Sequence, residues 1–390
     1  MNSAFFGTNI QVVSLHRPLT CNTALREEMF IAVHGGAGSH SSSTEKELKQ
    51  ALRLACKKAL DTSSNSPLDA AEAAISVLED DPHLNAGYGS NLTLQGTVEC
   101  DAAIMDGNSH FGSVGAVSGV KNPIHVARAL LEHSQTSDTL GRIPPLTLVS
   151  SGAHSFASSN PRTSSGIVDK EAMISPRARD RWLYWKQRLS SASIEDSGKN
   201  MYDLQDTVGA VTSCFGEMAS GVSSGGLLLK MEGRLGEAAA FGAGCWAQNI
   251  LAGRRIGMAC SISGTGEYIT RSGLARALGK AFEALEPVDP TEDIDPHVVM
   301  QKILIDEFWK PSKDLGEPGP SAGILLMTYE VGDGEPIVRV WCAFTTQTMA
   351  IAYASSRNPN PKALILRRPN ATASLRPDDK APVYMTAFTL

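Results

Sequence analysis

The first apolar run in the sequence predicts a strand. Residues 30–34 (FIAVH) precede the glycines at 35–38, a pattern typical of a buried strand that ends at a glycine turn. Later apolar runs, bounded by polar and glycine-containing segments, predict three more strands in this half of the chain. These strands are expected at residues 97–105, 112–117 and 146–149.

Helical periodicity appears between these strands. Thr44 and Glu47 have the spacing of a capping box, and apolar residues then recur at three- and four-residue intervals up to Ala59. Ser66 followed by Pro67 is typical of the start of a second helix. A third helix is expected at residues 124–131.

Residues 155–206 lack a sustained apolar period and are rich in Ser, Arg and Asp. This composition predicts a flexible linker, interrupted by a helix at about 177–189. The basic residues of that helix could form a nuclear import signal. Because Asp180 and Trp182 interrupt them, a solvated helix face is the favoured interpretation.

The strand pattern returns at Thr207. Residues 208–214 and 218–222, joined by a tight turn, predict a hairpin. Strands occur on both sides of the linker without regular alternation with helices, which favours two packed sheets covered by helices over a doubly wound parallel sheet. The remaining expected elements are helices at 268–284 and from Asp295-Pro296 onward, and strands at 323–329, 337–344 and 349–354.

Composition indicates a globular protein. The chain has 390 residues, of which 42% are hydrophobic and 19% charged, and no apolar run approaches the length needed to cross a bilayer. A net charge of -6 argues against a surface that coats nucleic acid. We therefore expect protein or small-molecule partners, with no nucleic acid and no membrane.

The cysteines indicate a cellular compartment and argue against two kinds of site. The seven cysteines are scattered, odd in number and without a Cys-x-x-Cys pair, which fits neither a disulfide scaffold nor a zinc site. The pattern predicts the reducing cytosol or nucleus, with no metal and no cofactor. Residues 1–26 lack a compact apolar segment behind a basic start, so a tethering arm is expected there.

The bond between Asp206 and Thr207 carries the most specific chemistry. If it is cut, Thr207 becomes an N-terminus that combines a hydroxyl nucleophile with an amine of pKa about 7.7 to 8.0, which can act as its base. The plain alternative is that Thr207 opens an ordinary strand. A Ser-His-Asp triad is disfavoured, because eight of the nine histidines precede the linker, so the triad would have to reach across it.

Other residues could complete a site around Thr207. Asn85 and the Ser263-Gly264 turn can donate hydrogen bonds to a developing oxyanion. Ser224, in a glycine-flanked turn, can hydrogen-bond the nucleophile, and Arg234 between two glycines can hold a carboxylate. Each has a plain alternative as a turn residue or surface charge.

Four short motifs resemble the type 2 asparaginase family of N-terminal nucleophile hydrolases. They are residues 206–211 (DTVGAV), 223–226 (SSGG), 233–236 (GRLG) and 263–267 (SGTGE). A finer resemblance is to the threonine-type endopeptidases of that family, and with it the likeness covers most of residues 30–354. It rests on residues 85–92, 99–107, 121–123, 141–145 and 244–247.

The resemblance implies a four-layer αββα sandwich of the N-terminal nucleophile hydrolase type. It implies one domain, 1–390, that cuts itself at Asp206-Thr207 into an α subunit, 1–206, and a β subunit, 207–390, which remain associated as (αβ)2. Thr207 would be the catalytic nucleophile and base, with Ser224 in support. Asn85, Ser263 and Gly264 would form the oxyanion hole, and the substrate-binding residues would be Arg234, Glu237 and Lys230.

The finer resemblance implies an endopeptidase that cuts protein substrates after Asp. Its substrates would be nuclear transcription regulators of the mixed-lineage leukaemia and TFIIA type, which places the protein in the cytoplasm and nucleus. An isoaspartyl peptidase or L-asparaginase acting on small β-aspartyl amides stays open, because Glu237 stands where asparaginases usually carry an ammonium-binding Asp. A third hypothesis is an uncut binding protein without catalysis.

Overall fold

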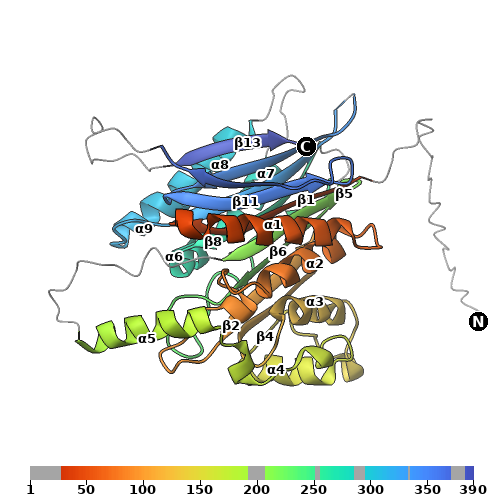
Figure 1. The fold of residues 1–390 in the computed structure, drawn as a ribbon. Coiled ribbons are helices and arrows are strands. Elements are labelled where there is room, and N and C mark those ends of the chain that lie inside the picture. The colour runs from red at the N-terminus through yellow and green to blue at the C-terminus, as the bar shows by residue number, and fades with distance from the viewer. Residues whose placement is uncertain (1–27, 192–206, 251–254, 285–294, 333, 370–382) are drawn as a thin grey trace, which may run out of the picture.

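The computed structural model describes residues 28–191, 207–250, 255–284, 295–332, 334–369 and 383–390. In this part of the chain, two β-sheets pack face to face and helices cover their outer faces, which gives an α+β sandwich of four layers (Figure 1). The sheets meet through β1, β5 and β6 of one and β7, β8 and β9 of the other. Two packed sheets, rather than one doubly wound sheet, are therefore confirmed.

The larger sheet has the order β12-β11-β1-β5-β6-β2-β3-β4 among the described residues, and every pair is antiparallel except β3 with β4. Its strands are β1 (Met29–Gly38), β2 (Cys100–Asp106), β3 (Phe111–Val117), β4 (Thr147–Val149), β5 (Val208–Cys214), β6 (Glu217–Ser224), β11 (Thr348–Ser355) and β12 (Lys362–Arg367).

The smaller sheet is antiparallel throughout, in the order β13-β10-β9-β8-β7. Its strands are β7 (Cys245–Gln248), β8 (Ile256–Gly264), β9 (Ala322–Glu330), β10 (Ile337–Phe344) and β13 (Tyr384–Thr389).

Helices form the outer layers. The larger sheet contacts α1 (Glu45–Leu60), α2 (Pro67–Glu79), α3 (Pro123–Ser134) and α4 (Ser150–Ser159). On the smaller sheet, α7 (Leu274–Ala284) packs against β7 and β8, joined by α6 (Gly266–Ser272), α8 (Pro296–Ile303), the π-helical turn Leu304–Trp309 and α9 (Lys310–Asp314). Within these residues, no helix is long and apolar enough to cross a membrane.

Strand β5 lies at the centre of the molecule because both of its faces are buried. Val208 and Ala210 pack into the core beneath the helices, whereas Val211 packs between the two sheets. This alternation follows from the two-residue period of a strand. Thr207 directly precedes β5, so the central strand fixes the position of its backbone.

Several predictions of turns and helix starts are confirmed. The hairpin β5–β6 turns through Phe215 (φ 52°) and Gly216 (φ 80°), the pair of positive φ angles that a tight two-residue turn requires. The Oγ of Ser66 accepts a hydrogen bond from the Asp69 N–H and caps α2, and the Asp295 side chain caps α8 in the same way. These starts were predicted from short-range chemistry alone.

Two local predictions at the N-terminal end were wrong. β1 does not end at His34 but runs to Gly38, with a register shift between His34 and Ala37, because Gly36 (φ 104°) lets the strand bulge and continue. The capping box at Thr44 and Glu47 does not form, since Thr44 makes no side-chain cap. A 3₁₀ turn, Ser42–Thr44, instead leads into α1.

The structure also differs from the predicted linker at 155–206. Half of α4, two 3₁₀ turns and α5 (Pro176–Ser191) lie within residues 155–191, and only the helix near 177–189 was anticipated. The apolar period is weak because Ala178 is the only fully buried residue of α5. Residues 192–206, and the N-terminal arm at 1–26, lie outside the described residues.

Some elements gave too little signal to be predicted. β7 and β8 consist largely of small residues among glycines, and β12 and β13 follow the last apolar run that was recognised. The expected helix 268–284 is two helices, because Gly273 adopts a left-handed conformation (φ 55°) between α6 and α7. The six cysteines in the described part of the chain are buried and free.

Candidate active site

Thr207 sits at the start of β5 and is 4% exposed. Its Oγ1 donates a hydrogen bond to Oε1 of Glu237 at 2.8 Å and lies 3.2 Å from Oγ of Ser224. A hydroxyl carries one proton, so it donates to the closer partner, which is the Glu237 carboxylate. The nucleophile predicted from sequence therefore has a potential base at hydrogen-bonding distance.

Ser224 is held beside Thr207 by the sheet. It ends β6, and the register pairs its neighbour Ser223 with Val208, the residue after Thr207. The Ser224 Oγ accepts a hydrogen bond from the Gly226 N–H at 3.0 Å. The side chain is thus fixed at both the strand and the following turn.

Glu237 is buried among the residues around Thr207, at 3% exposure. Burial raises the pKa of Glu237 to about 7, although the nearby Arg234 guanidinium and the Thr207 hydrogen bond oppose the shift. A carboxylate with a pKa near neutrality can both accept and return a proton at working pH. Glu237 is therefore suited to proton transfer as well as to binding a cation.

Arg234 points toward the same region and is anchored by a carboxylate. Its Nε and Nη2 donate to Oε1 and Oε2 of Glu267 at 2.8 Å and 2.7 Å, a two-pronged contact. The loop that carries Arg234 is held by Asp101, whose Oδ2 accepts from the Gly236 N–H at 2.8 Å. The Nη1 of Arg234 takes no part in the two bonds to Glu267, so the Arg234 guanidinium still has donors for a second carboxylate.

Asn85 comes from the first half of the chain and is locked in place. Its Nδ2 donates to the Gly226 carbonyl at 2.9 Å, and its Oδ1 accepts from the Asn91 N–H at 2.8 Å. A Cβ on Gly225 would collide with the Asn85 Oδ1, so glycine is required for this approach. One N–H of the Asn85 amide remains beyond its bond to Gly226.

A hollow with an empty volume of about 190 Å³ joins these groups. It brings together six of the residues predicted from the sequence, with Gly226 and Leu227 in addition. The described residues that line it are Asn85, Thr207, Ser224, Gly226, Leu227, Arg234, Glu237 and Gly264.

Three predicted residues are placed elsewhere or not described. The Ser263 Oγ accepts from the Ala37 N–H at 3.0 Å, and Ser263 is not among the described residues that line the hollow. Lys230 is buried and donates to the Glu99 carbonyl at 2.6 Å. This contact stabilises the fold. Asp206, the residue before the predicted cut, lies outside the described residues.

The sequence reasoning missed one close neighbour of the nucleophile. His34 is fully buried on β1, where it pairs with Gly209, and its Nε2 lies 2.8 Å from the Ser261 Oγ. Burial lowers the pKa of His34 to about 4, while a contact with the Thr207 backbone opposes that shift, so the imidazole is neutral. Gly209 carries no side chain because a Cβ there would collide with this imidazole.

No group of three or more His, Cys, Asp or Glu residues within the described ranges could hold a metal ion. The described lining of the hollow offers the hydroxyl, carboxylate, amide and guanidinium groups already named. That set suits nucleophilic attack on a carbonyl carbon.

Comparison with known proteins agrees with this geometry. The model of the asparaginase family matches residues 27–287. The isoaspartyl peptidase/L-asparaginase of Mus musculus is 36% identical over 255 residues, which cover 64% of this chain and 71% of the mouse protein. The plant-type L-asparaginase of Pyrococcus horikoshii is 37% identical over 258 residues, covering 63% and 77%, and the isoaspartyl peptidase of Salmonella typhimurium is 34% identical over 287 residues, covering 70% and 84%.

The chain belongs to the asparaginase family, whose members are hydrolases with the N-terminal nucleophile hydrolase fold. The αββα sandwich expected from the sequence is thereby confirmed. The names of these three relatives are isoaspartyl peptidase/L-asparaginase, plant-type L-asparaginase and isoaspartyl peptidase.

Proposed function

We propose that this protein is an amide hydrolase that becomes active by cutting itself before Thr207. The observation that carries the proposal is the placement of a buried threonine hydroxyl 2.8 Å from a carboxylate, in a hollow that also contains an arginine. An internal threonine is a poor nucleophile without a base beside it. Here Glu237 supplies one before any cut has occurred.

Self-cleavage would begin with proton transfer from the Thr207 hydroxyl to Glu237. The Oγ1 attacks the carbonyl carbon of Asp206, the C–N bond breaks, and the departing Thr207 amine takes up the proton from Glu237. The product is an ester between the Asp206 carbonyl and Oγ1, which water then hydrolyses to a free carboxyl and a free hydroxyl. An N–H of Asn85 can support the oxyanion formed in the attack.

After the cut, the new amine of Thr207 would take over as base. It accepts the proton of its own hydroxyl while Oγ1 attacks the substrate, and it returns the proton to the leaving amine. Glu237 would stabilise the ammonium that forms when the amine accepts this proton. The same carboxylate thus serves the precursor as a base and the mature protein as a counter-charge.

The first candidate substrate class is the small β-aspartyl amide. The names of the relatives favour it, since they describe isoaspartyl peptidase and L-asparaginase activities. Arg234 offers donors for the α-carboxylate of such a substrate, and Glu237 offers an acceptor for its free α-ammonium. In this case the two residues act as the positive and negative ends of one amino-acid clamp.

The second candidate is a peptide bond that follows Asp in a protein. The observation that favours it is internal to the sequence: the residue before the expected self-cleavage point is Asp206. A guanidinium that holds the Asp206 carboxylate during maturation could hold the same group of a substrate. The finer motif resemblance noted above is to the threonine aspartase of this family, taspase 1, and extends this candidate to transcription regulators of the mixed-lineage leukaemia and TFIIA type.

One experiment separates the two candidates. The processed protein is incubated with asparagine, with a β-aspartyl dipeptide, and with an octapeptide that has one α-linked Asp at its centre. Release of ammonia or of the dipeptide's leaving amino acid favours the first class, and cleavage of the octapeptide after Asp favours the second. Turnover of none of the three would overturn the proposal as a whole.

Assembly and location are further proposals. We propose that the two fragments remain associated, because β5 and β6 of the second fragment pair with β1 and β2 of the first. We further propose that two such units assemble as (αβ)2, as the family resemblance implies. A location in cytoplasm and nucleus rests on the free cysteines and on the substrate class of the second candidate.

A further inference from the structure

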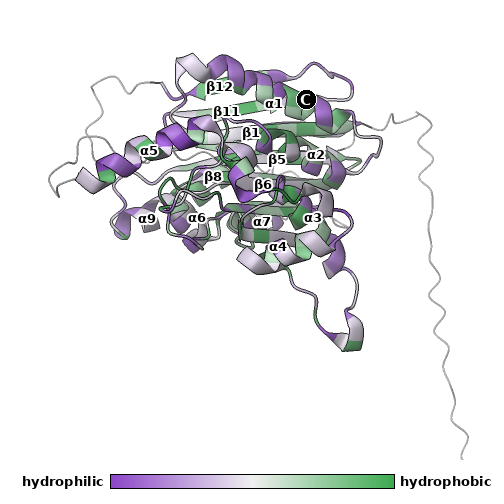
Figure 2. Cartoon of the chain, turned by 60° about the horizontal axis from the view of Figure 1, so that its bottom comes forward, coloured by the Kyte–Doolittle hydropathy of each residue, from purple (hydrophilic) through white to green (hydrophobic). Residues whose placement is uncertain are grey.

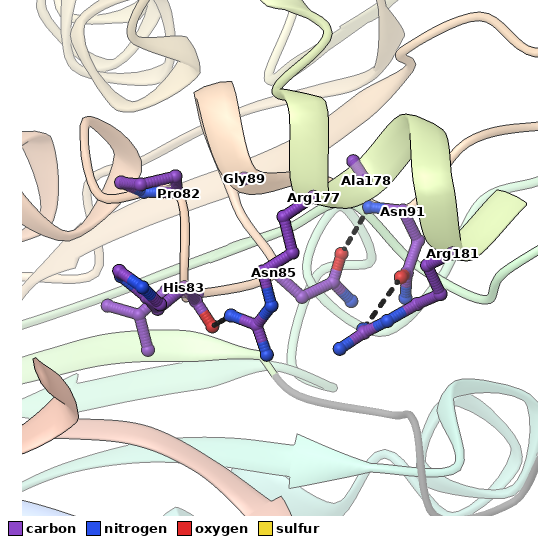
Figure 3. A pocket seen from close by; sticks show the side chains of 9 residues that line it. Pro82, His83, Asn85, Gly89, Asn91, Arg177, Ala178 and Arg181 are labelled. Carbon is purple, nitrogen blue, oxygen red and sulfur yellow. Dashed lines mark hydrogen bonds between the residues drawn. The ribbon is translucent and has the colours of Figure 1, made fainter. Parts of the chain in front are cut away.

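A second hollow is also lined by Asn85 (Figure 3). Its empty volume is about 270 Å³, part of it open to solvent. Asn85 lines both this hollow and the one around Thr207. The described residues that line the second hollow are Pro82, His83, Leu84, Asn85, Gly89, Asn91, Arg177, Ala178 and Arg181.

Two arginines of α5 line this hollow and supply hydrogen-bond donors to it. Arg177 and Arg181 are four residues apart, so they share one face of the helix, and Figure 3 shows both side chains reaching toward the loop at 82–91. The Arg177 Nη1 donates to the His83 carbonyl at 2.9 Å, and the Arg181 Nη1 lies 3.5 Å from the Asn91 Oδ1. The helix is thereby docked on the loop through neutral acceptors.

The described lining of the hollow contains arginine but no acidic residue. Within the described part of the chain, Arg177 forms no ion pair. Among the lining residues, the His83 ring donates to Asp81 Oδ1 at 3.1 Å. A guanidinium with donors left over is a good partner for a carboxylate, because the planar fork matches its two oxygens.

We propose that this second hollow is a subsite for a carboxylate side chain of a peptide substrate whose scissile bond lies at Thr207. The inference rests on the proposed function and extends it, because Asn85 would separate the reacting bond from the recognised side chain. Only a substrate longer than a single amino acid could reach both hollows. The subsite would therefore favour acidic peptides over free asparagine.

The test uses the processed protein and a set of octapeptides with one central cleavable Asp bond, α-linked in one series and β-linked in the other. At each flanking position, Glu is compared with Gln, which has the same shape but no charge, and kcat/KM is measured. At one position we expect Glu to be preferred about tenfold or more, the usual size of one charge-assisted hydrogen bond. Arg177→Gln should remove this preference, because kcat/KM for the Glu peptide should fall much further than kcat/KM for the Gln peptide.

Two further variants control for folding and charge. Arg177→Lys keeps the charge without the fork and should keep part of the preference. Arg179→Gln changes an arginine of the same helix that is paired with Glu171 outside the hollow and should leave the preference intact. If Arg177→Gln lowers kcat/KM equally for the Glu and Gln peptides, Arg177 acts only by docking α5. That result would overturn the subsite.

The outcomes separate this inference from the proposed function. If peptides are cut without a preference for Glu at any position, or if only asparagine is turned over, the subsite is wrong and the hydrolase stands. If neither peptides nor asparagine nor a β-aspartyl dipeptide is turned over, both proposals are wrong.

Discussion

The two hollows that share Asn85 are built differently. The hollow around Thr207 is assembled from the ends of β5, β6 and β8 and the loop after β6, and its carboxylate is buried and shifted to a pKa of about 7. The second hollow lies between a loop and the half-exposed face of α5. Thr207 and Ser224 are thus held at strand ends, where positions are rigid, and the proposed recognition group Arg177 is held on a helix that packs on a loop, as expected for a site that adapts to substrates.

The hydropathy of the elements reflects this division. The strands are apolar in the interior of the molecule, whereas α5 is largely polar along its length (Figure 2). Its contacts with the body of the protein include hydrogen bonds from side chains: Trp182 Nε1 donates to the Thr93 carbonyl at 2.8 Å, and Arg177 donates to the His83 carbonyl. Changes in the first hollow should therefore abolish chemistry, and changes in the second should alter selectivity.

The largest effect is expected at the nucleophile. Thr207→Ala removes the hydroxyl that attacks in both self-cleavage and turnover, so neither should be detected, a loss of at least about 10³-fold. Denaturing gels over several days and an ammonia-release assay measure the two reactions. A Thr207→Ala protein that still yields two fragments would contradict the mechanism.

A smaller but distinctive effect is expected at the base. Glu237→Gln keeps the shape of the side chain and removes its basicity, and it should slow self-cleavage by about 10² to 10⁴-fold. In the parent protein the rate should rise with pH through about 7, because the carboxyl with its raised pKa must lose its proton before it can accept another. The Glu237→Gln variant should lose this dependence of the self-cleavage rate on pH. If Glu237 had only a structural role, the variant would keep the same pH dependence.

The amide that borders both hollows comes next. Asn85→Ala removes the N–H available to an oxyanion and should lower kcat by about 10² to 10³-fold, with a smaller change in KM. It also leaves the Asn91 N–H without its acceptor, so thermal unfolding must be followed in parallel. A normal kcat in a folded variant would remove Asn85 from the oxyanion hole.

The smallest effect is expected for a conservative change at the carboxylate-binding group. Arg234→Lys keeps the charge but loses the planar fork that Glu267 also uses, and KM should rise roughly tenfold with little change in kcat. Steady-state kinetics on a β-aspartyl dipeptide test this split. A fall in kcat alone would place Arg234 in the chemistry rather than in substrate binding.

The sequence predicted the first hollow far better than the second. Thr207, Ser224 and Arg234 stand in short glycine-bounded motifs, where local geometry leaves few alternatives. The contact of Glu237 with the Thr207 hydroxyl could not be foreseen, because it depends on how the loop after β6 folds back over β5. His34 escaped attention because its neighbour Gly209 is brought beside it only by strand pairing.

The second hollow had almost no sequence signal. Arg177 and Arg181 were interpreted as part of a solvated helix face in a linker, and nothing in their spacing indicates that α5 docks on the loop at 82–91. Contacts between segments nearly 100 residues apart, made by polar side chains, follow neither a strand nor a helix period. Such sites appear only when the tertiary structure is known.

The central claim, that the bond before Thr207 is cut to create the nucleophile, can be tested by N-terminal sequencing of the purified protein after incubation at neutral pH. The account predicts a second N-terminus that reads Thr-Val-Gly-Ala, beginning at Thr207. A single intact chain of 41.4 kDa after prolonged incubation, or a cut at any other bond, would contradict it.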